Sequence, residues 1–166
     1  MADTIRVCLA DYANPAHGQA LVQMLDAYAR DPMGGGDGLS AFAKANLVAE
    51  LAKVPGAFSV LAFDGEADTT PVGLVNCMQG FSTFACKPLI NVHDVAVIPA
   101  YRGRGIAERM FALAEDVARE RGACKLTLEV LSGNSGAIRL YTRVGFAGYA
   151  LGSTTGEARF MQKYLP

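Results

Sequence analysis

Residues 90–121 constrain the fold of this chain more than any other segment. Residues 90–98 have the apolar pattern of a strand that Pro99 ends, and residues 105–121 have the apolar period of an amphipathic helix. A second strand pattern follows at residues 125–131. A strand, a helix and a strand in this order form a parallel pair, because the crossover helix returns the chain to the same end of the sheet.

The rest of the chain alternates between the strand period and the helix period. We predict strands at residues 4–9, 57–63, 72–78, 90–98, 125–131, 146–151 and 158–164, and helices at residues 17–30, 40–53, 105–121 and 134–144. Residues 79–88 show neither period and are predicted to be irregular. The predicted fold is α/β, with a mixed, mostly antiparallel central sheet and helices on both faces, in one domain over residues 1–166.

Composition narrows the classes of protein that fit. The net charge is −1, from 15 basic and 16 acidic residues, which argues against a broad nucleic-acid surface. No apolar stretch approaches the ~20 residues that cross a bilayer, and the N-terminus lacks the apolar core of a signal peptide. The four cysteines form no CxxC pair. We therefore expect a cytoplasmic protein with reduced thiols, no metal site, no nucleic-acid partner and no membrane partner.

The turn between the strand at 90–98 and the helix at 105–121 has the features of an anion-binding site. Glycines allow a phosphate oxygen to approach the backbone, and a helix start offers unpaired N–H groups at the positive end of its dipole. A P-loop is excluded because Ile106 follows the second glycine, and a dinucleotide fingerprint is excluded because Glu108 replaces Gly or Ala. The remaining pattern is Arg-x-x-Gly-x-Ala at Arg102, Gly105 and Ala107.

At these residues the chain resembles the GNAT superfamily of acyl-CoA-dependent N-acyltransferases. Their pyrophosphate loop reads Gln/Arg-x-x-Gly-x-Gly/Ala after a strand that ends in Val-x-Pro. A second match follows downstream, in the order Leu128-Glu129-Val130, Asn134, Leu140-Tyr141 and Gly145-Phe146. The resemblance implies a splayed parallel strand pair, acetyl-CoA as co-substrate, acetyl transfer to a primary amine of a small molecule or peptide, and a homodimer.

The resemblance also implies where acetyl-CoA binds. The implied residues are Val95, Ala96 and Val97 on the strand, Arg102, Gly103, Arg104, Gly105, Ile106 and Ala107 in the turn and helix start, and Asn134. A strand N–H would polarise the thioester carbonyl, and the turn N–H groups would bind the pyrophosphate. The side chains of Arg102 and Arg104 are also consistent with solvated surface charge, and Asn134 is also a helix cap.

Amide formation needs a proton acceptor for the amine and a proton donor for the leaving thiolate. Tyr141 stands where the family carries its general acid, although a core aromatic residue is the alternative. Glu129 stands where the ribosomal-protein alanine acetyltransferases have their proton acceptor. His93 stands where polyamine acetyltransferases carry a glutamate, and its ordinary pKa suits a base at neutral pH. Some family members use only a chain of waters, so three alternatives stay open for the base.

The acceptor site is expected between the first two helices, their glycine-rich connection and residues 79–88. The candidate lining residues are Asp26, Tyr28, Asp31, Asp37, Phe81 and Phe84. The connection at residues 34–38 is either a linker or a mobile lid. Two other classes stay open: a domain that binds acyl-CoA without catalysis, and a transferase of a larger acyl group.

Overall fold

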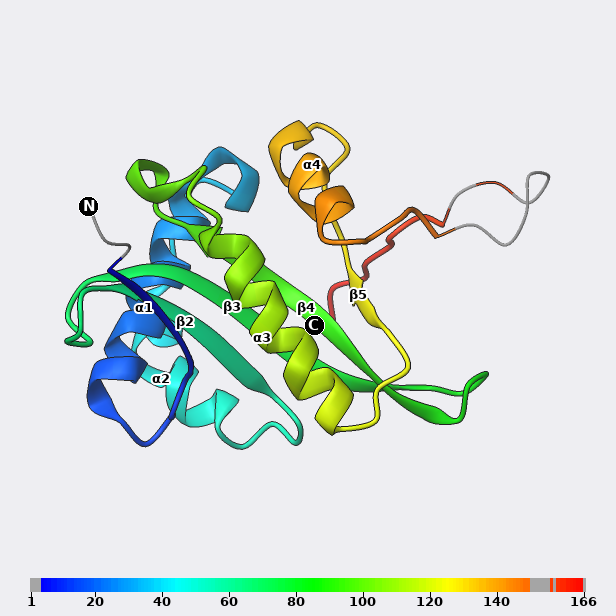
Figure 1. Ribbon diagram of the computed structural model, residues 1–166, viewed down its shortest axis with the longest axis horizontal. Coiled ribbons are helices and arrows are strands. Elements are labelled where there is room, and N and C mark those ends of the chain that lie inside the picture. The colour runs from blue at the N-terminus through cyan, green and yellow to red at the C-terminus, as the bar shows by residue number, and fades with distance from the viewer. Residues whose placement is uncertain (1–3, 150–155, 157, 166) are drawn as a thin grey trace. The chain divides into compact units, whose positions relative to one another are not determined.

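The computed structural model describes residues 4–149, 156 and 158–165 (Figure 1). The chain divides into two compact units, unit 1 over Met1–Leu128 and unit 2 over Glu129–Pro166. Among the described residues, unit 1 holds the sheet and three α-helices, and unit 2 holds one α-helix. We describe the two units separately.

A five-stranded sheet in the order β1-β2-β3-β4-β5 is the centre of unit 1. Its strands are β1 (Ile5–Leu9), β2 (Phe58–Asp64), β3 (Pro71–Ser82), β4 (Lys87–Val97) and β5 (Leu126–Leu128). The first four pair antiparallel, and β4 and β5 pair parallel. The helices are α1 (Pro15–Arg30), α2 (Ala41–Leu51) and α3 (Ile106–Glu120), with short 3-10 helices η1 (Pro32–Gly34) and η2 (Pro99–Tyr101). The predicted mixed, mostly antiparallel sheet is confirmed.

Helices cover both faces of this sheet, as Figure 1 shows for α3 against α1 and α2. On the face of α1 and α2, Leu21 and Met24 pack with Leu61 and Leu74 in one buried cluster. On the α3 face, Gly73 lies so close to the Met110 side chain that an added Cβ would come within 2.8 Å of it. Alternate residues of β2 and β3 therefore serve two cores, which explains their nearly continuous apolar runs.

The prediction that residues 79–88 are irregular is wrong. β3 and β4 remain paired out to Ser82 and Lys87, so this segment is the end of a long hairpin. Its residues are exposed or half-buried, and Phe84 at the turn is 98% exposed. Because neither face of this arm is buried, its sequence carries no alternating apolar pattern to reveal the strands.

Unit 2 contains α4 (Ser135–Arg143), capped by the Asn134 side chain, which accepts a hydrogen bond from the Ala137 N–H at 3.1 Å. The strands predicted at 146–151 and 158–164 are not found: residues 146–149 and 158–164 are described and form no strand. Residues 150 and 151 lie outside the described part. A strand pattern shows only that a segment can pair, and side chains such as Phe160 and Met161 are exposed.

Candidate functional site

Within unit 1, β5 ends beside a β-bulge of β4 and leaves residues 93–97 without a partner strand on that side, an edge that we call the open edge of β4. Pairing with β5 ends at Val92 and Leu128, whereas β4 continues to Val97. The register with β3 slips between Asn76 and Cys77, which face Asp94 and Val92, so His93 is the extra residue. The parallel pair expected from the resemblance is present, and its pairing stops before residue 93.

Backbone N–H groups point out of this edge. Ile98 donates its N–H to Val72 of β3 at 3.0 Å. Because N–H groups alternate in direction along a strand, Ala96 also faces β3, and Val95 and Val97 direct their N–H groups away from it. Of the three predicted strand residues, Val95 and Val97 thus direct their N–H groups away from β3, and Ala96 does not.

His93 is held in one tautomer beside the bulge. The Asn91 amide nitrogen donates to the Thr127 hydroxyl at 3.1 Å, so the Asn91 amide oxygen is the partner of His93 Nδ1 at 2.8 Å. His93 Nδ1 must then carry the proton, which leaves the lone pair on Nε2. The imidazole is exposed, so Nε2 is available to accept a proton.

The bulge also changes which side chains share a face. Asn91 lies opposite Met78, which packs on the cluster beneath α1, and Asp94 lies opposite Asn76 two residues away. Asn91 and Asp94 therefore share the α1 face although they are three residues apart. Unbroken alternation would place residues 91 and 94 on opposite faces, and the bulge breaks that alternation.

The turn before α3 is open to an anion. Gly103 and Gly105 adopt φ angles of 75° and 73°, and a Cβ built on either would meet no atom within 4 Å. Gly105 is the N-cap of α3, and no side chain caps the helix. The backbone at Gly103 and Gly105 therefore has open space beside it, at the positive end of the α3 dipole, whereas Ile106 and Ala107 are buried.

The two arginines of this turn contact the protein itself. Arg102 Nε donates to the Val97 carbonyl at 3.0 Å, and its guanidinium lies 3.4 Å from the Asp31 carboxylate. Arg104 donates to the Ala100 carbonyl at 3.3 Å and covers the Tyr101 ring. Arg102 thus links the end of β4 to the end of α1, while both side chains remain largely exposed.

Two of the predicted acceptor residues serve the connection between α1 and α2. Asp26 accepts from the Leu39 N–H at 2.8 Å and pairs with Arg30 and Lys44, and these contacts lower its pKa to about 2. Asp31 accepts from the Met33 N–H, which with Arg102 lowers the pKa of its carboxyl. Both carboxylates therefore have structural partners.

The connection at residues 34–38 is folded against α1. The Gly36 N–H donates to the Ala29 carbonyl at 2.8 Å, and a Cβ at Gly34 would lie 2.0 Å from the Tyr28 carbonyl oxygen. This contact explains the glycine at residue 34 and favours the linker interpretation. Tyr28 is half-buried, and burial together with Asp94 and Asp31 raises its pKa. Asp37 is exposed on this connection.

A row of polar side chains crosses the α1 face and was not predicted. The Tyr12 hydroxyl lies 2.9 Å from Ser59 Oγ, Ser59 Oγ donates to the Asn76 amide oxygen at 2.6 Å, and Asn76 Nδ2 donates to Asp94 at 3.0 Å. Ser59 is fully buried and Asn76 is 3% exposed. No motif marks this row, because only the strand register brings its members together.

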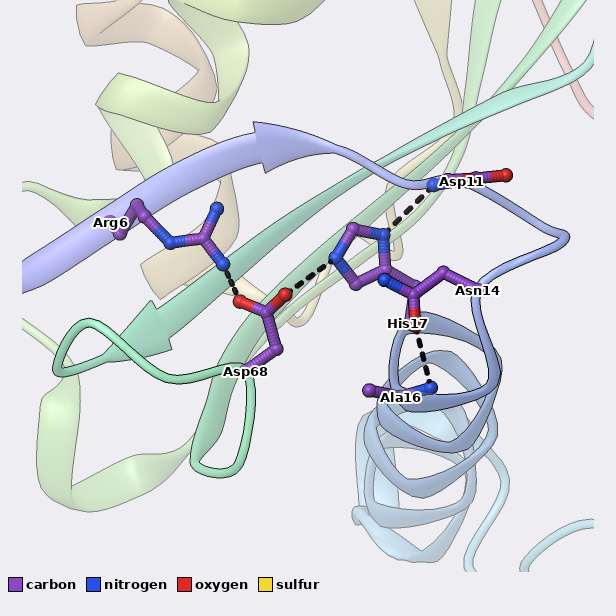
Figure 2. A network of polar contacts seen from close by, with 6 residues as sticks. All are labelled: Arg6, Asp11, Asn14, Ala16, His17 and Asp68. Atoms are coloured by element: carbon purple, nitrogen blue, oxygen red, sulfur yellow. Dashed lines mark hydrogen bonds and ion pairs between the residues drawn. The ribbon is translucent and has the colours of Figure 1, made fainter.

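A second polar group was also missed and ties α1 to the sheet (Figure 2). His17 Nδ1 accepts from the Asp11 N–H at 2.9 Å, so Nε2 carries the proton and donates to Asp68 at 3.0 Å. Asp68 also pairs with Arg6, and the imidazole stacks on Phe63. His17 is 8% exposed, so we interpret this group as structural.

Unit 2 carries the other predicted catalytic residues. Tyr141 lies in the last turns of α4, half-buried, with its ring edge-on to Phe146 at 6.1 Å between centroids. Glu129 follows directly after β5 and is exposed. Asn134 holds the helix start, as the capping interpretation predicted.

Burial makes the thiol of Cys77 a poor nucleophile. Cys77 is buried on β3, and burial raises the pKa of its thiol to about 12. Within the described residues, no group of three His, Cys, Asp or Glu side chains is placed to hold a metal ion, and no helix is long and apolar enough to span a bilayer.

The model of the acetyltransferase (GNAT) family matches residues 21–146 of this chain. The chain belongs to this family. It is 40% identical over 85 residues to the streptothricin acetyltransferase of Streptomyces lavendulae, and this match covers 49% of this chain and 45% of that protein. It is 37% identical over 75 residues to the N-alpha-acetyltransferase MAK3 of Arabidopsis thaliana, which covers 45% of this chain and 38% of that protein. The matches thus span less than half the length of either relative.

Solved structures share the fold over nearly the whole chain. The crystal structure of a probable acetyltransferase superposes with a TM-score of 0.74 at 20% identity and covers 97% of both chains. A ribosomal-protein-alanine N-acetyltransferase from Brucella melitensis biovar Abortus 2308 gives a TM-score of 0.67 at 19% identity, covering 96% of this chain and 99% of that one.

Proposed function

We propose that this protein transfers the acetyl group of acetyl-CoA to a primary amine by direct attack in a ternary complex. The observation that carries the proposal is the uncapped glycine turn at the start of α3, beside the open edge of β4. Family membership supports the use of acetyl-CoA. Units 1 and 2 are proposed to act together as one domain, since the family match begins in unit 1 and continues to residue 146 in unit 2.

The residues present fit the co-substrate. The backbone N–H groups from Gly103 to Ala107 would bind the pyrophosphate, because the space that a Cβ would fill at Gly103 and Gly105 is open. The N–H groups of Val95 and Val97 would bind and polarise the thioester carbonyl. The contacts of Arg102 with Val97 and Asp31 would fix the end of β4 against α1.

His93 is proposed as the base. The bond to Asn91 leaves Nε2 with its lone pair, so it can accept a proton from the acceptor ammonium. The neutral amine nitrogen then attacks the carbonyl carbon, the C–N bond forms and the C–S bond breaks. The ammonium gives up two protons in all. One goes to solvent through His93, and the other restores the proton that the general acid donates to the thiolate.

Tyr141 is proposed as the donor of that proton to the departing CoA thiolate. Its position on α4 matches the family motif, and a tyrosine hydroxyl can act as a general acid. Glu129 remains the second candidate for the base, because it directly follows β5. Direct attack of the amine on the thioester needs no cysteine acyl-enzyme.

The acceptor is proposed to be an amine of a small molecule or of a peptide. This range follows the names of the relatives, one a streptothricin acetyltransferase and one an N-alpha-acetyltransferase. A homodimer in the cytoplasm is proposed from the family resemblance alone, and light scattering of the purified chain tests the dimer. Thiol release from acetyl-CoA in the presence of amines tests the transferase.

A further inference from the structure

We propose that Asp94 binds the ammonium group of the acceptor, and that Asn76 and Ser59 are positioning residues that hold its carboxylate. The inference rests on the proposed function and narrows its substrate class to alkyl amines, which are cationic when they bind. Neutral aromatic amines would gain nothing from this carboxylate.

The row Ser59–Asn76–Asp94 follows the strand register. Ser59 of β2 lies directly opposite Asn76 of β3, and Asn76 lies directly opposite Asp94 of β4. Side chains directly opposite each other in neighbouring strands share a face and touch. The row therefore runs straight across three strands on the face that α1 covers.

Each member of the row donates a hydrogen bond to the next one, from Ser59 to Asn76 and from Asn76 to Asp94. Ser59 Oγ donates to the Asn76 amide oxygen, so its lone pair is left to accept from the Tyr12 hydroxyl. The same arrangement turns the Asn76 NH₂ group toward Asp94. An ionised carboxylate has about four lone-pair sites, and Asn76 occupies one of them. The carboxylate is thus fixed in orientation and retains capacity for a cation.

Burying the polar side chains of this row stabilises the fold less than apolar side chains would at the same places. The row crosses a core built from residues such as Leu21, Leu61 and Leu74, where burying a hydroxyl and an amide gains less than burying apolar side chains of the same size. Ser59 and Asn76 have their partners within the row and end on a charged group. That end, at Asp94, is the half-buried member nearest the open edge of β4.

Asp94 also lies beside the proposed reaction centre. It adjoins His93 at the bulge and shares the α1 face with Asn91, which orients His93. Tyr28 of α1 is close enough for the Asp94 charge to raise the pKa of its phenol, so α1 walls this side. An ammonium bound by Asp94 would therefore stand next to the base that deprotonates it.

Calorimetry on the full chain with CoA bound tests the proposal without requiring turnover. The probes are spermidine, an aminoglycoside and a tetrapeptide with a free N-terminus. Asp94→Asn keeps the size and the hydrogen bond from Asn76 but removes the charge. We expect it to weaken the probe that binds wild type by about 10- to 100-fold, the range for hydrogen bonds to charged groups. Asp116→Asn makes the same change at an exposed side chain of α3 and is the matched control.

The positioning role is tested by a double-mutant cycle. Asn76→Ala and Ser59→Ala each should weaken probe binding by about 3- to 10-fold, and neither should weaken it further in the Asp94→Asn background. A purely structural role would give the same loss in both backgrounds. Thermal unfolding shows whether each variant is folded. If Asn76→Ala does not fold, Ser59→Ala alone carries the test.

Two outcomes overturn the inference: no probe binds the wild-type protein, or the Asp94→Asn protein binds as well as wild type. These outcomes differ from a failure of the proposed function. If the wild type transfers acetyl groups and Asp94→Asn leaves the KM of the amine unchanged, the inference alone is wrong. If Asp94 controls probe binding but no amine releases thiol, the transferase is wrong.

Discussion

His93 shows how one extra residue in a strand creates a chemical site. Without the bulge, period-two alternation would put Asn91 and Asp94 on opposite faces of β4. The bulge puts both on the α1 face, with the His93 imidazole bonded to Asn91. Two residues with different chemistry, an imidazole with a free Nε2 lone pair and an oriented carboxylate, thereby meet where β4 has lost its parallel neighbour.

Replacing His93 tests the choice of base. His93→Gln can still bond to Asn91 but cannot accept a proton, so kcat should fall about 10²- to 10⁴-fold at pH 7, the usual contribution of a general base. Steady-state kinetics on the best amine measures this loss. Glu129→Gln is the comparison: if it carries the loss and His93→Gln does not, the base is Glu129.

Replacing Tyr141 tests the acid. Tyr141→Phe removes only the hydroxyl, so kcat should fall at least about 10-fold while the KM of acetyl-CoA stays within about twofold. The Tyr141 ring packs against Phe146, and Phe keeps that contact. Turnover at the wild-type rate in this variant would remove Tyr141 from the mechanism.

At the scale of elements, the ends of helices carry the site. The start of α3 has two glycines with positive φ and no capping side chain, and both glycines have open space beside them. The end of α1 is treated in the opposite way: Asp26 and Asp31 bind backbone N–H groups of the following connection and hold it closed. The helix end that is proposed to bind the pyrophosphate thus has no side-chain cap, whereas the end of α1 is hydrogen-bonded to the connection that follows it.

Gly105→Ala tests the open helix start. Forcing an L-residue to a φ of 73° costs about 1–2 kcal/mol, and the new methyl group would stand where the pyrophosphate is proposed. We expect the KM of acetyl-CoA to rise at least about 10-fold. Gly122→Ala is the matched control, because Gly122 has a φ of 69° and equally open space at the other end of α3. Equal effects of the two changes on KM would rule out the phosphate role.

The connection after α1 predicts a dependence of stability on pH. The pKa of Asp26 is about 2 in the folded chain, below its ordinary value, first because the Leu39 N–H donates to the carboxylate. Its contribution to the free energy of unfolding is therefore present above about pH 4 and is lost as the pH falls toward 2. Chemical denaturation should show Asp26→Asn less stable than wild type at pH 6 and equal to it near pH 2. A constant difference at both pH values would contradict this assignment.

The sequence predicts elements better than it predicts contacts. Helices such as α3 and the buried strands have apolar periods, and the glycine turn has a motif, so both could be found from residue order. The exposed arm around Phe84 has no buried face and therefore no period. Asn76 and Ser59 look like ordinary strand residues, because they meet only through the register of β2 with β3. Asn76 meets Asp94 through the register of β3 with β4, which the bulge at His93 shifts.

For the whole molecule, the two units divide the proposed chemistry. Unit 1 holds the open edge of β4, the glycine turn, His93 and Asp94, whereas unit 2 holds Glu129, Asn134 and Tyr141. The family match from residue 21 to residue 146 spans both. Catalysis by the mechanism proposed here requires residues from each unit, so the intact chain is the form to assay.

The most direct test is the release of free thiol from acetyl-CoA by the purified chain against a panel of polyamines, aminoglycosides, amino acids and short peptides. The account predicts thiol release that depends on one class of alkyl amine and is matched by an equal amount of acetylated product. Tight binding of acetyl-CoA with no thiol release for any amine would contradict it and would point to a domain that binds acyl-CoA without catalysis.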